Sequence, residues 1–252
     1  MTVNTKYTMN EQAKSFDQIV NRRRAYRIFD TEVQIPDEVV KRSLERAIKS
    51  PSSSNMQLWE FYRIKSKENL KLVGAYCLNQ SGATTASEIV VFVARPDLWK
   101  DRQKANLKNL ENFVSKDVKN KLFGSSAVSY YKKVMPQFYD TSFPCVKNFI
   151  KRIYIWNKSR KSPFMQDVYS KHVPIVVNKS VALAAQTFML SITAEGYDSL
   201  PMEGLDSKRI KKLLNLPKKA SINMAIAVGK GATKGVRGKR FRLDYEAVVF
   251  EM

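Results

Sequence analysis

The stretch Asn21–Phe29 reads Asn-Arg-Arg-Arg-Ala-Tyr-Arg-Ile-Phe and places four arginines within nine residues. It follows an amphipathic segment whose apolar residues Phe16, Ile19 and Val20 have helical spacing. The guanidinium groups should therefore gather where that helix ends, and such a cluster suits an anion. The alternative is that Arg22, Arg23 and Arg24 only cap the helix dipole and face water.

A second stretch, Ser50–Phe61, favours the anion site over simple capping. It reads Ser-Pro-Ser-Ser-Ser-Asn-Met-Gln-Leu-Trp-Glu-Phe, so hydroxyls and amides crowd the connection between a helix ending near Ser50 and a strand beginning near Trp59. We call residues 50–57 the Ser/Asn loop. Together with the arginines, its side chains suggest a planar polar ligand that carries a phosphate.

Composition sets the bounds of the fold. At 252 residues with 44% hydrophobic content, the chain can bury a substantial core as one domain or as one domain with an excursion. It has no run of about 18 apolar residues and no secretion signal at residues 1–10, so we expect a cytoplasmic protein without a transmembrane segment. Cys77 and Cys145 fit no disulfide or zinc spacing and should be reduced, partly buried thiols. His172, the single histidine, is expected to be a surface or satisfied core residue, and no metal site is expected.

The charge of the chain is strongly positive. The 44 Lys and Arg residues against 23 Asp and Glu give a formal net charge of +21. Such a field favours anionic ligands, and it also attracts nucleic acid or acidic lipid without specificity. A basic, non-catalytic protein that binds nucleic acid or an acidic membrane is therefore one alternative. No specific nucleic acid is expected, because the basic residues are scattered from Lys6 to Arg242 without a known recognition motif.

Hydrophobic spacing predicts helices alternating with strands. Asn10 suits the N-cap of the first helix, and the strand at 88–94 carries consecutive apolar residues and should be buried on both faces. Residues 197–204 are expected to form a turn, and residues 241–250 a final extended segment. Small residues on the helix at 175–195 permit close approach of another helix, in the core or across a dimer interface. Helices are predicted at about 10–21, 36–50, 67–78, 175–195 and 207–214, and strands at 59–64, 88–94 and 222–228.

From Pro96 to about His172 the character of the sequence changes. Lysine-rich stretches with interspersed aromatic residues predict several helices outside the sheet. We interpret this region as a helical excursion that could lie over a pocket. Its aromatic residues either build a local satellite core or line a substrate site through one or two of Tyr139, Phe143 and Phe149.

Four motifs in order resemble the FMN-dependent nitroreductase family. They are Arg-Arg-x-x-Arg-x-Phe at 23–29, Pro-Ser-Ser-x-Asn-x-Gln-x-Trp-x-Phe at 51–61, Pro201-Met-Glu-Gly204, and Gly238-Lys-Arg-Phe-Arg-Leu243. The resemblance covers about 19–95 and 176–249. It implies an α+β fold of mixed α/β layers, with a central mixed sheet flanked by helices and a C-terminal strand exchanged across a homodimer. Residues 1–252 would form a single FMN-binding domain, with the excursion at about 96–172 covering the active site.

The resemblance also implies which residues hold FMN in a cleft between two identical subunits. Guanidinium groups from both ends of the chain would hold the phosphate, since their forks suit a dianion better than one lysine does. Backbone near Gly204 would lie by flavin N5, and the Ser/Asn loop of the partner would meet the isoalloxazine. The expected cofactor-binding residues are Arg23, Arg24, Ala25, Arg27, Pro51, Ser52, Ser53, Asn55, Gln57, Asn79, Glu203, Gly204, Lys239, Arg240 and Arg242.

The implied function is reduction of nitroaromatics, quinones or related small acceptors by NADH or NADPH. The reductant would deliver hydride to flavin N5 and leave before the acceptor binds, which gives ping-pong kinetics, and no catalytic side chain is expected. Two positions depart from the family pattern: Leu58 replaces the proline usual between Gln and Trp, and Gly82 replaces a basic residue that some members carry. A further alternative on the same fold is a flavin-binding sensor or flavin carrier.

Overall fold

The computed structural model describes residues 10–116 and 126–252, and it confirms the predicted α+β class. In the described residues, a four-stranded sheet has the order β1-β2-β4-β3, and each neighbouring pair is antiparallel. An isolated parallel bridge joins Ala25 to Ser199 at the β3 edge. Part of the predicted excursion, residues 117–125, lies outside the described residues, as do residues 1–9. The strands are β1 (Trp59–Ile64), β2 (Glu88–Ala94), β3 (Asp198–Met202) and β4 (Ser221–Gly229).

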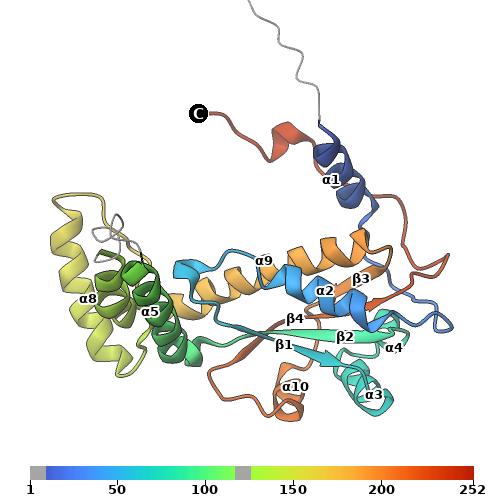
Figure 1. Cartoon of the computed structure of the whole chain (residues 1–252), viewed down its shortest axis with the longest axis horizontal. Coiled ribbons are helices and arrows are strands. Elements are labelled where there is room, and N and C mark those ends of the chain that lie inside the picture. The colour runs from blue at the N-terminus through green and yellow to red at the C-terminus, as the bar shows by residue number, and fades with distance from the viewer. Residues whose placement is uncertain (1–9, 117–125) are drawn as a thin grey trace, which may run out of the picture.

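The central strand β2 explains the layered architecture. Its side chains alternate between the two faces of the sheet, so its continuous apolar run is buried along its whole length. Val90 and Phe92 pack into one core with α2 and α9, whereas Ile89 and Val91 pack into a second core with α3 and α10. Figure 1 shows these helices covering opposite faces of the sheet. The helices of the two layers are α2 (Asp37–Ala47), α9 (His172–Ala194), α3 (Lys67–Tyr76), α4 (Ser81–Thr84) and α10 (Ser207–Leu213).

Helix boundaries follow the signals in the sequence. The side chain of Asn10 accepts a hydrogen bond from the Ala13 amide at 2.8 Å and caps α1 (Glu11–Arg22). Gly196, with a φ of 87°, adopts the left-handed conformation just after α9 ends. The strands predicted at 59–64 and 88–94 are confirmed at those bounds.

Three local predictions are wrong. Residues 197–204 contain the strand β3, not only a turn; Pro201 is tolerated there because β3 is the last strand in the sheet order. Helix α2 ends at Ala47, before the predicted end near Ser50, so Ile48 follows the helix and is exposed. Cys145 is exposed, although Cys77 is fully buried and burial raises the pKa of its thiol to about 11.

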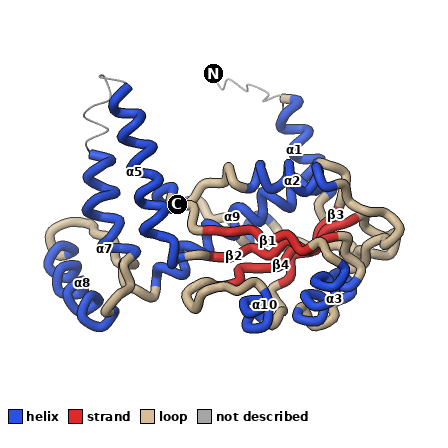
Figure 2. The backbone as a smooth tube through the Cα atoms, turned by 60° about the horizontal axis from the view of Figure 1, so that its bottom comes forward, coloured by secondary structure: helices blue, strands red, loops and turns tan. Residues whose placement is uncertain are grey.

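The described part of the excursion is mostly helical and extends from one end of the sheet, as Figures 1 and 2 show. Its aromatic residues divide into two groups. Tyr139 is buried and belongs to the core beneath α9, whereas Phe143 and Phe149 are exposed on the excursion. Its elements are the short 3-10 helix Pro96–Leu98, α5 (Trp99–Lys116), the π-helical turn Tyr130–Val134, α7 (Met135–Tyr139) and α8 (Pro144–Ser159).

Helix α9 is a long apolar helix of 23 residues that packs in the core. Within the described part of the chain, it is the one helix long and apolar enough to cross a membrane by length and composition. Half of that apolar window is buried, and Val181, Ala184 and Phe188 pack fully buried in the core against the sheet. Core packing therefore accounts for its hydrophobicity.

The C-terminal residues 239–252 run away from the sheet and pass beside α1 (Figure 1). They contain the short 3-10 helix Tyr245–Ala247 and, in the described chain, no strand. Several large apolar side chains in this tail are more than half exposed. They are Phe241, Leu243, Tyr245, Val248 and Phe250.

Candidate functional site

Residues 238–240, near the C-terminus, contact residues 20–24, where α1 ends. The Arg240 guanidinium donates hydrogen bonds to the carbonyl oxygens of Arg23 at 2.6 Å, Asn21 at 2.9 Å and Val20 at 3.2 Å. It thereby satisfies the last carbonyls of the helix, where the negative end of the helix dipole lies. The Arg24 guanidinium donates to the carbonyl of Gly238 at 2.9 Å. Arginines predicted from both ends of the sequence are therefore neighbours.

Positive charge is concentrated at this contact. We call Arg23, Arg24, Arg240 and Arg242 the arginine cluster. Burial lowers the pKa of Arg23, and the charges of Arg240, Arg242 and Arg24 lower it further. Within residues 10–116 and 126–252, none of the four forms an ion pair with an acidic side chain. Because like charges held together oppose folding, the arrangement fits a bound anion that neutralises them.

Glycines let the backbone beside this cluster pack closely. The amide of Arg27 donates to the carbonyl of Gly235 at 2.6 Å, which holds residues 23–29, the arginine loop, against residues 229–239. A Cβ on Gly235 would lie 2.5 Å from the carbonyl oxygen of Ile28 and 2.9 Å from that of Ala232. No side chain fits there without moving the backbone. Arg27 itself is exposed beside this contact, as is Lys239.

The turn after α3 joins the same region. Asn79 has a φ of 52°, and the next residue, Gln80, donates from its side chain to the carbonyl of Gly204 at 2.9 Å. A Cβ on Gly82 would lie 3.3 Å from the carbonyl oxygen of Tyr26 and 2.3 Å from Cδ2 of Leu200. A basic side chain at position 82 would not fit in this arrangement. One chain therefore brings together the arginine loop, residues 79–82, Glu203–Gly204 and the C-terminal basic residues.

The Ser/Asn loop lies elsewhere on the chain. The amide of Ser53 donates to Ser180 Oγ at 3.2 Å, whereas the Arg22 guanidinium donates to the carbonyl of Thr193 at 3.1 Å. Ser180 and Thr193 are more than three turns apart on α9, which is about 20 Å along its axis. The predicted residues Pro51, Ser52, Ser53, Asn55 and Gln57 therefore share one loop, which begins where Ser50 Oγ is hydrogen-bonded to Thr187 Oγ1 at 2.8 Å and continues to the level of Ser180, away from Thr193.

The Ser/Asn loop is held in an unusual backbone conformation. Ser54, Asn55 and Gln57 all have φ values near 50°, a region that costs free energy for residues other than glycine. The Tyr131 hydroxyl donates to the carbonyl of Ser54 at 2.7 Å, and the amide groups of Asn55 and Asn106 are hydrogen-bonded at 3.1 Å. The excursion thus fixes the loop, which is typical of a preformed binding site.

Comparison with known proteins gives the family. The nitroreductase family model matches residues 20–230. The chain belongs to the nitroreductase family. The Bacillus subtilis protein YdgI, named as an NAD(P)H nitroreductase, is 28% identical over 240 residues, which cover 92% of this chain and 96% of YdgI.

Solved structures agree with this fold. The Bacillus subtilis protein YdfN, named as a nitroreductase, superposes with a TM-score of 0.73 at 20% identity, covering 95% of this chain and 99% of YdfN. A protein of Exiguobacterium sibiricum, named as a nitroreductase and solved in complex with FMN, gives a TM-score of 0.65 at 21% identity, covering 98% of this chain and 99% of that one.

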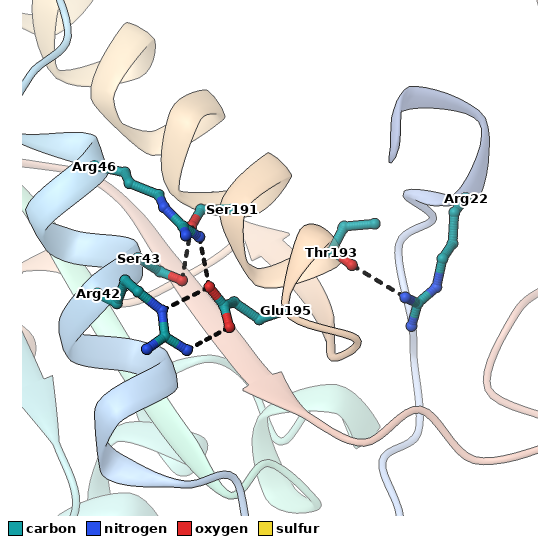
Figure 3. Close-up of polar contacts among 7 residues, drawn as sticks. All are labelled: Arg22, Arg42, Ser43, Arg46, Ser191, Thr193 and Glu195. Carbon is teal, nitrogen blue, oxygen red and sulfur yellow. Dashed lines mark hydrogen bonds and ion pairs between the residues drawn. The ribbon is translucent and has the colours of Figure 1, made fainter. Parts of the chain in front are cut away.

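In this nitroreductase-family chain, an ion-pair network fastens α2 to the end of α9 that anchors Arg22 (Figure 3). Arg42 donates to both carboxylate oxygens of Glu195 at 2.8 and 2.6 Å, and Arg46 donates to Glu195 at 2.6 Å and to Ser191 at 2.9 Å. The hydrogen bond from Arg42 is the main cause that lowers the pKa of Glu195 to about 2. The network joins α2 to the part of α9 that contacts Arg22.

Several residues that build this site were not singled out from the sequence. Gln80 and Gly235 hold its backbone, and Asn106, Tyr130 and Tyr131 hold the Ser/Asn loop from the excursion. In each of these hydrogen bonds the two partners are more than 50 residues apart in the sequence, so no short motif marks them. The cluster of Gly229, Gly231, Gly235 and Gly238 was the available signal, since glycines crowd where backbones approach closely.

Proposed function

We propose that this nitroreductase-family protein is an FMN-dependent oxidoreductase that uses NADH or NADPH to reduce a small aromatic acceptor such as a nitro compound or a quinone. The arginine cluster carries the proposal, because its four guanidinium groups gather without an acidic partner among the described residues. The neighbour solved with FMN and the relative named as an NAD(P)H nitroreductase support the choice of cofactor and reductant.

The residues present fit the phosphate of FMN. A phosphate dianion accepts paired hydrogen bonds from guanidinium forks, and its charge would offset the mutual repulsion of Arg23, Arg240 and Arg242. Part of the N–H groups of Arg240 are hydrogen-bonded to the carbonyls at the end of α1, so Arg240 orients the cluster. Arg23 and Arg242 have further N–H groups that can bind the phosphate. In this proposal the phosphate joins the two ends of the chain.

The remaining residues would orient the ring system. When bound, FMN supplies hydride transfer chemistry at N5 of its flavin. Gln80 fixes the Gly204 carbonyl, which keeps the Glu203–Gly204 backbone in place beside the Asn79 turn. Exposed Arg27 would place positive charge at the pyrimidine edge, which favours negative charge that develops there. The chain's contribution is therefore position and electrostatic field, with no catalytic acid or base assigned.

A second copy of the chain would complete the site. Ser53 in the Ser/Asn loop and Arg22 beside the arginine cluster are anchored at levels of α9 about 20 Å apart, so we propose that one ligand contacts the loop of one subunit and the cluster of the other. The tail supports a homodimer, since its large apolar side chains lack cover in a single chain. Helix α1 supports it too, because it has no buried residue. We also propose a cytoplasmic location, where NADH and NADPH would be available as reductants.

The test is spectroscopic. The purified protein should be yellow with flavin absorbance, and anaerobic addition of NADH or NADPH should bleach it. Addition of a nitroaromatic or quinone to the prereduced protein should restore the colour, and a screen of acceptors then ranks the substrates. A protein that retains flavin but is not bleached would be a flavin carrier or sensor. A colourless protein that binds polyanions with steep salt dependence would contradict the proposal and favour the non-catalytic alternative.

A further inference from the structure

Helix α8 presents its apolar residues outward. On most helices that pack on a core, the apolar face points inward and the polar face points to water. In α8 the one buried residue is Ile155, and Lys147 and Lys151 lie on the same, inward side, with Lys151 donating to the carbonyl of Val168 at 2.7 Å. The outward side carries large apolar side chains that are each more than half exposed. These residues form the α8 surface: Phe143, Val146, Phe149, Ile150, Ile153, Tyr154 and Trp156.

The position of α8 leaves this surface open. Figures 1 and 2 both place α8 at the outer edge of the excursion, at the opposite end of the molecule from α1 and β3. The apolar groups continue into the following turn, where Phe164 packs edge-on against Tyr154 and Met165 is 59% exposed. An apolar patch of this kind on a soluble domain marks a surface that is covered in use.

The rim of the α8 surface is cationic. From Thr141 to Lys161 the sequence contains six basic residues and no acidic residue. Lys147 and Lys151 lie inward, and Lys147 pairs with Asp140, so the rim consists of Arg152, Lys158, Arg160 and Lys161. Two of these cations lie over the aromatic rings of the surface: the Arg160 guanidinium is 4.8 Å from the Trp156 ring centroid, and Lys158 Nζ is 5.9 Å from that of Tyr154. Aromatic rings beside cations are the side chains that prefer the headgroup level of a bilayer.

We propose that the α8 surface docks on an anionic lipid bilayer, with Phe149, Ile150 and Ile153 entering the acyl boundary and the surrounding lysines and arginines contacting the headgroups. The combination of an apolar face, interfacial aromatic residues and a basic rim is that of a helix that lies in the plane of a membrane surface. This assignment also gives part of the +21 net charge a role.

The chemistry of the surface favours lipid over two other partners. Nucleic acid stacks on aromatic rings, but the aliphatic residues Val146, Ile150 and Ile153 in the middle of this surface offer bases no stacking face. A second copy joined face to face through α8 would oppose two helices that each carry basic residues and no acidic residue, which is repulsive. Anionic lipid complements both the charge and the apolar character. The inference concerns this surface alone and does not depend on the proposed catalytic function.

The test is binding of the full-length protein to vesicles of phosphatidylcholine with and without phosphatidylglycerol, followed by flotation. Wild type should float with the anionic vesicles and much less with phosphatidylcholine alone. The double variant F149S/I153S should weaken binding by at least about tenfold, because it removes two large apolar side chains from the bilayer boundary. The variant L78S removes an apolar side chain that is 66% exposed on the α3 side, and it should bind like wild type.

Two further measurements separate the partners. Trp156 is the most exposed tryptophan in the chain, so its fluorescence should shift to the blue on anionic vesicles and lose this shift in W156F. Light scattering should give the same molar mass for F149S/I153S as for wild type. Unchanged vesicle binding of F149S/I153S would overturn the proposal, as would a lower mass, which would show that a second copy covers α8. Binding to nucleic acid that is as tight as vesicle binding and is weakened equally in F149S/I153S would also overturn it, because it would assign the α8 surface to nucleic acid.

Discussion

Replacement of Arg23 by Gln tests the arginine cluster through two effects of opposite sign. Without a bound anion, Arg23 is partly buried beside three other guanidinium groups, and both burial and their charges lower its pKa. Removing its charge relieves that repulsion, so the thermal midpoint of the flavin-free protein should stay the same or rise. Any rise should diminish with added salt, because salt screens repulsion between partly exposed charges.

The same substitution should weaken FMN binding. A hydrogen bond to a charged group contributes about 1.5–3 kcal/mol, so loss of one guanidinium–phosphate contact corresponds to an affinity about 10- to 150-fold lower. The assay is titration of flavin-free protein with FMN, followed by quenching of flavin fluorescence, alongside thermal unfolding of the same samples. Inorganic phosphate should raise the thermal midpoint of flavin-free wild type more than that of R23Q.

A matched control is R209Q. The side chain of Arg209 is 69% exposed on α10 and pairs with Asp206 at 3.1 Å. The substitution therefore removes an arginine far from the cluster. This variant should bind FMN like wild type. If R23Q loses thermal stability without FMN and yet binds FMN normally, Arg23 is a structural residue and the phosphate assignment is wrong.

Three further predictions concern the frame of the site. Gly235→Ala should lower the free energy of unfolding by about 1–3 kcal/mol and weaken FMN retention, because the added Cβ would lie 2.5 Å from a backbone oxygen. The control is Gly74→Ala, whose Cβ would lie 3.6 Å from the nearest atom, and it should not lower the thermal midpoint. Glu195 has a pKa lowered from 4.5 to about 2, so the stability it contributes is present above about pH 4.5 and lost as the pH falls toward 2. Acid titration of thermal midpoints should therefore be flatter in that range for Glu195→Gln, and an equally steep titration would contradict this role. Deletion of residues 244–252 should halve the molar mass measured by light scattering, and an unchanged mass would show that the tail is not needed for assembly.

The central strand was predictable because its signal is local. The apolar run at 88–94 can be buried on both faces only in the middle of a layered fold, and β2 lies there. Strand β3 was missed because Pro201 and the neighbouring Gly204 are turn residues, and only its place beside β4 makes Pro201 acceptable. Pairing with a distant partner overrode the local propensity.

The candidate site was partly predictable because some of its residues also lie in local sequence motifs. The arginines at both ends of the chain formed recognisable motifs, and the contact between Arg240 and the Arg23 carbonyl agrees with the expectation that they converge. The sequence did not show that Arg240 would cap α1, or that Asn106 and Tyr131 would hold the Ser/Asn loop. Those contacts depend on how the excursion packs, and its lysine-rich sequence carries no motif for it.

The geometry of α9 connects the proposed dimer to the proposed cofactor site. One face of α9 is buried against the sheet, while Ile175 and Leu183 on its outer face are half exposed. If two copies pack these outer faces with a twofold axis near Gln186, the level of Ser180 in one subunit faces the level of Thr193 in the other. Within one chain, Ser180 and Thr193 are about 20 Å apart along the helix, at about 1.5 Å per residue. The twofold axis would bring Ser180 of one subunit to the same level as Thr193 of the other. In this proposed dimer each of the two sites would receive a Ser/Asn loop from one subunit and an arginine cluster from the other, so assembly and cofactor binding should be lost together.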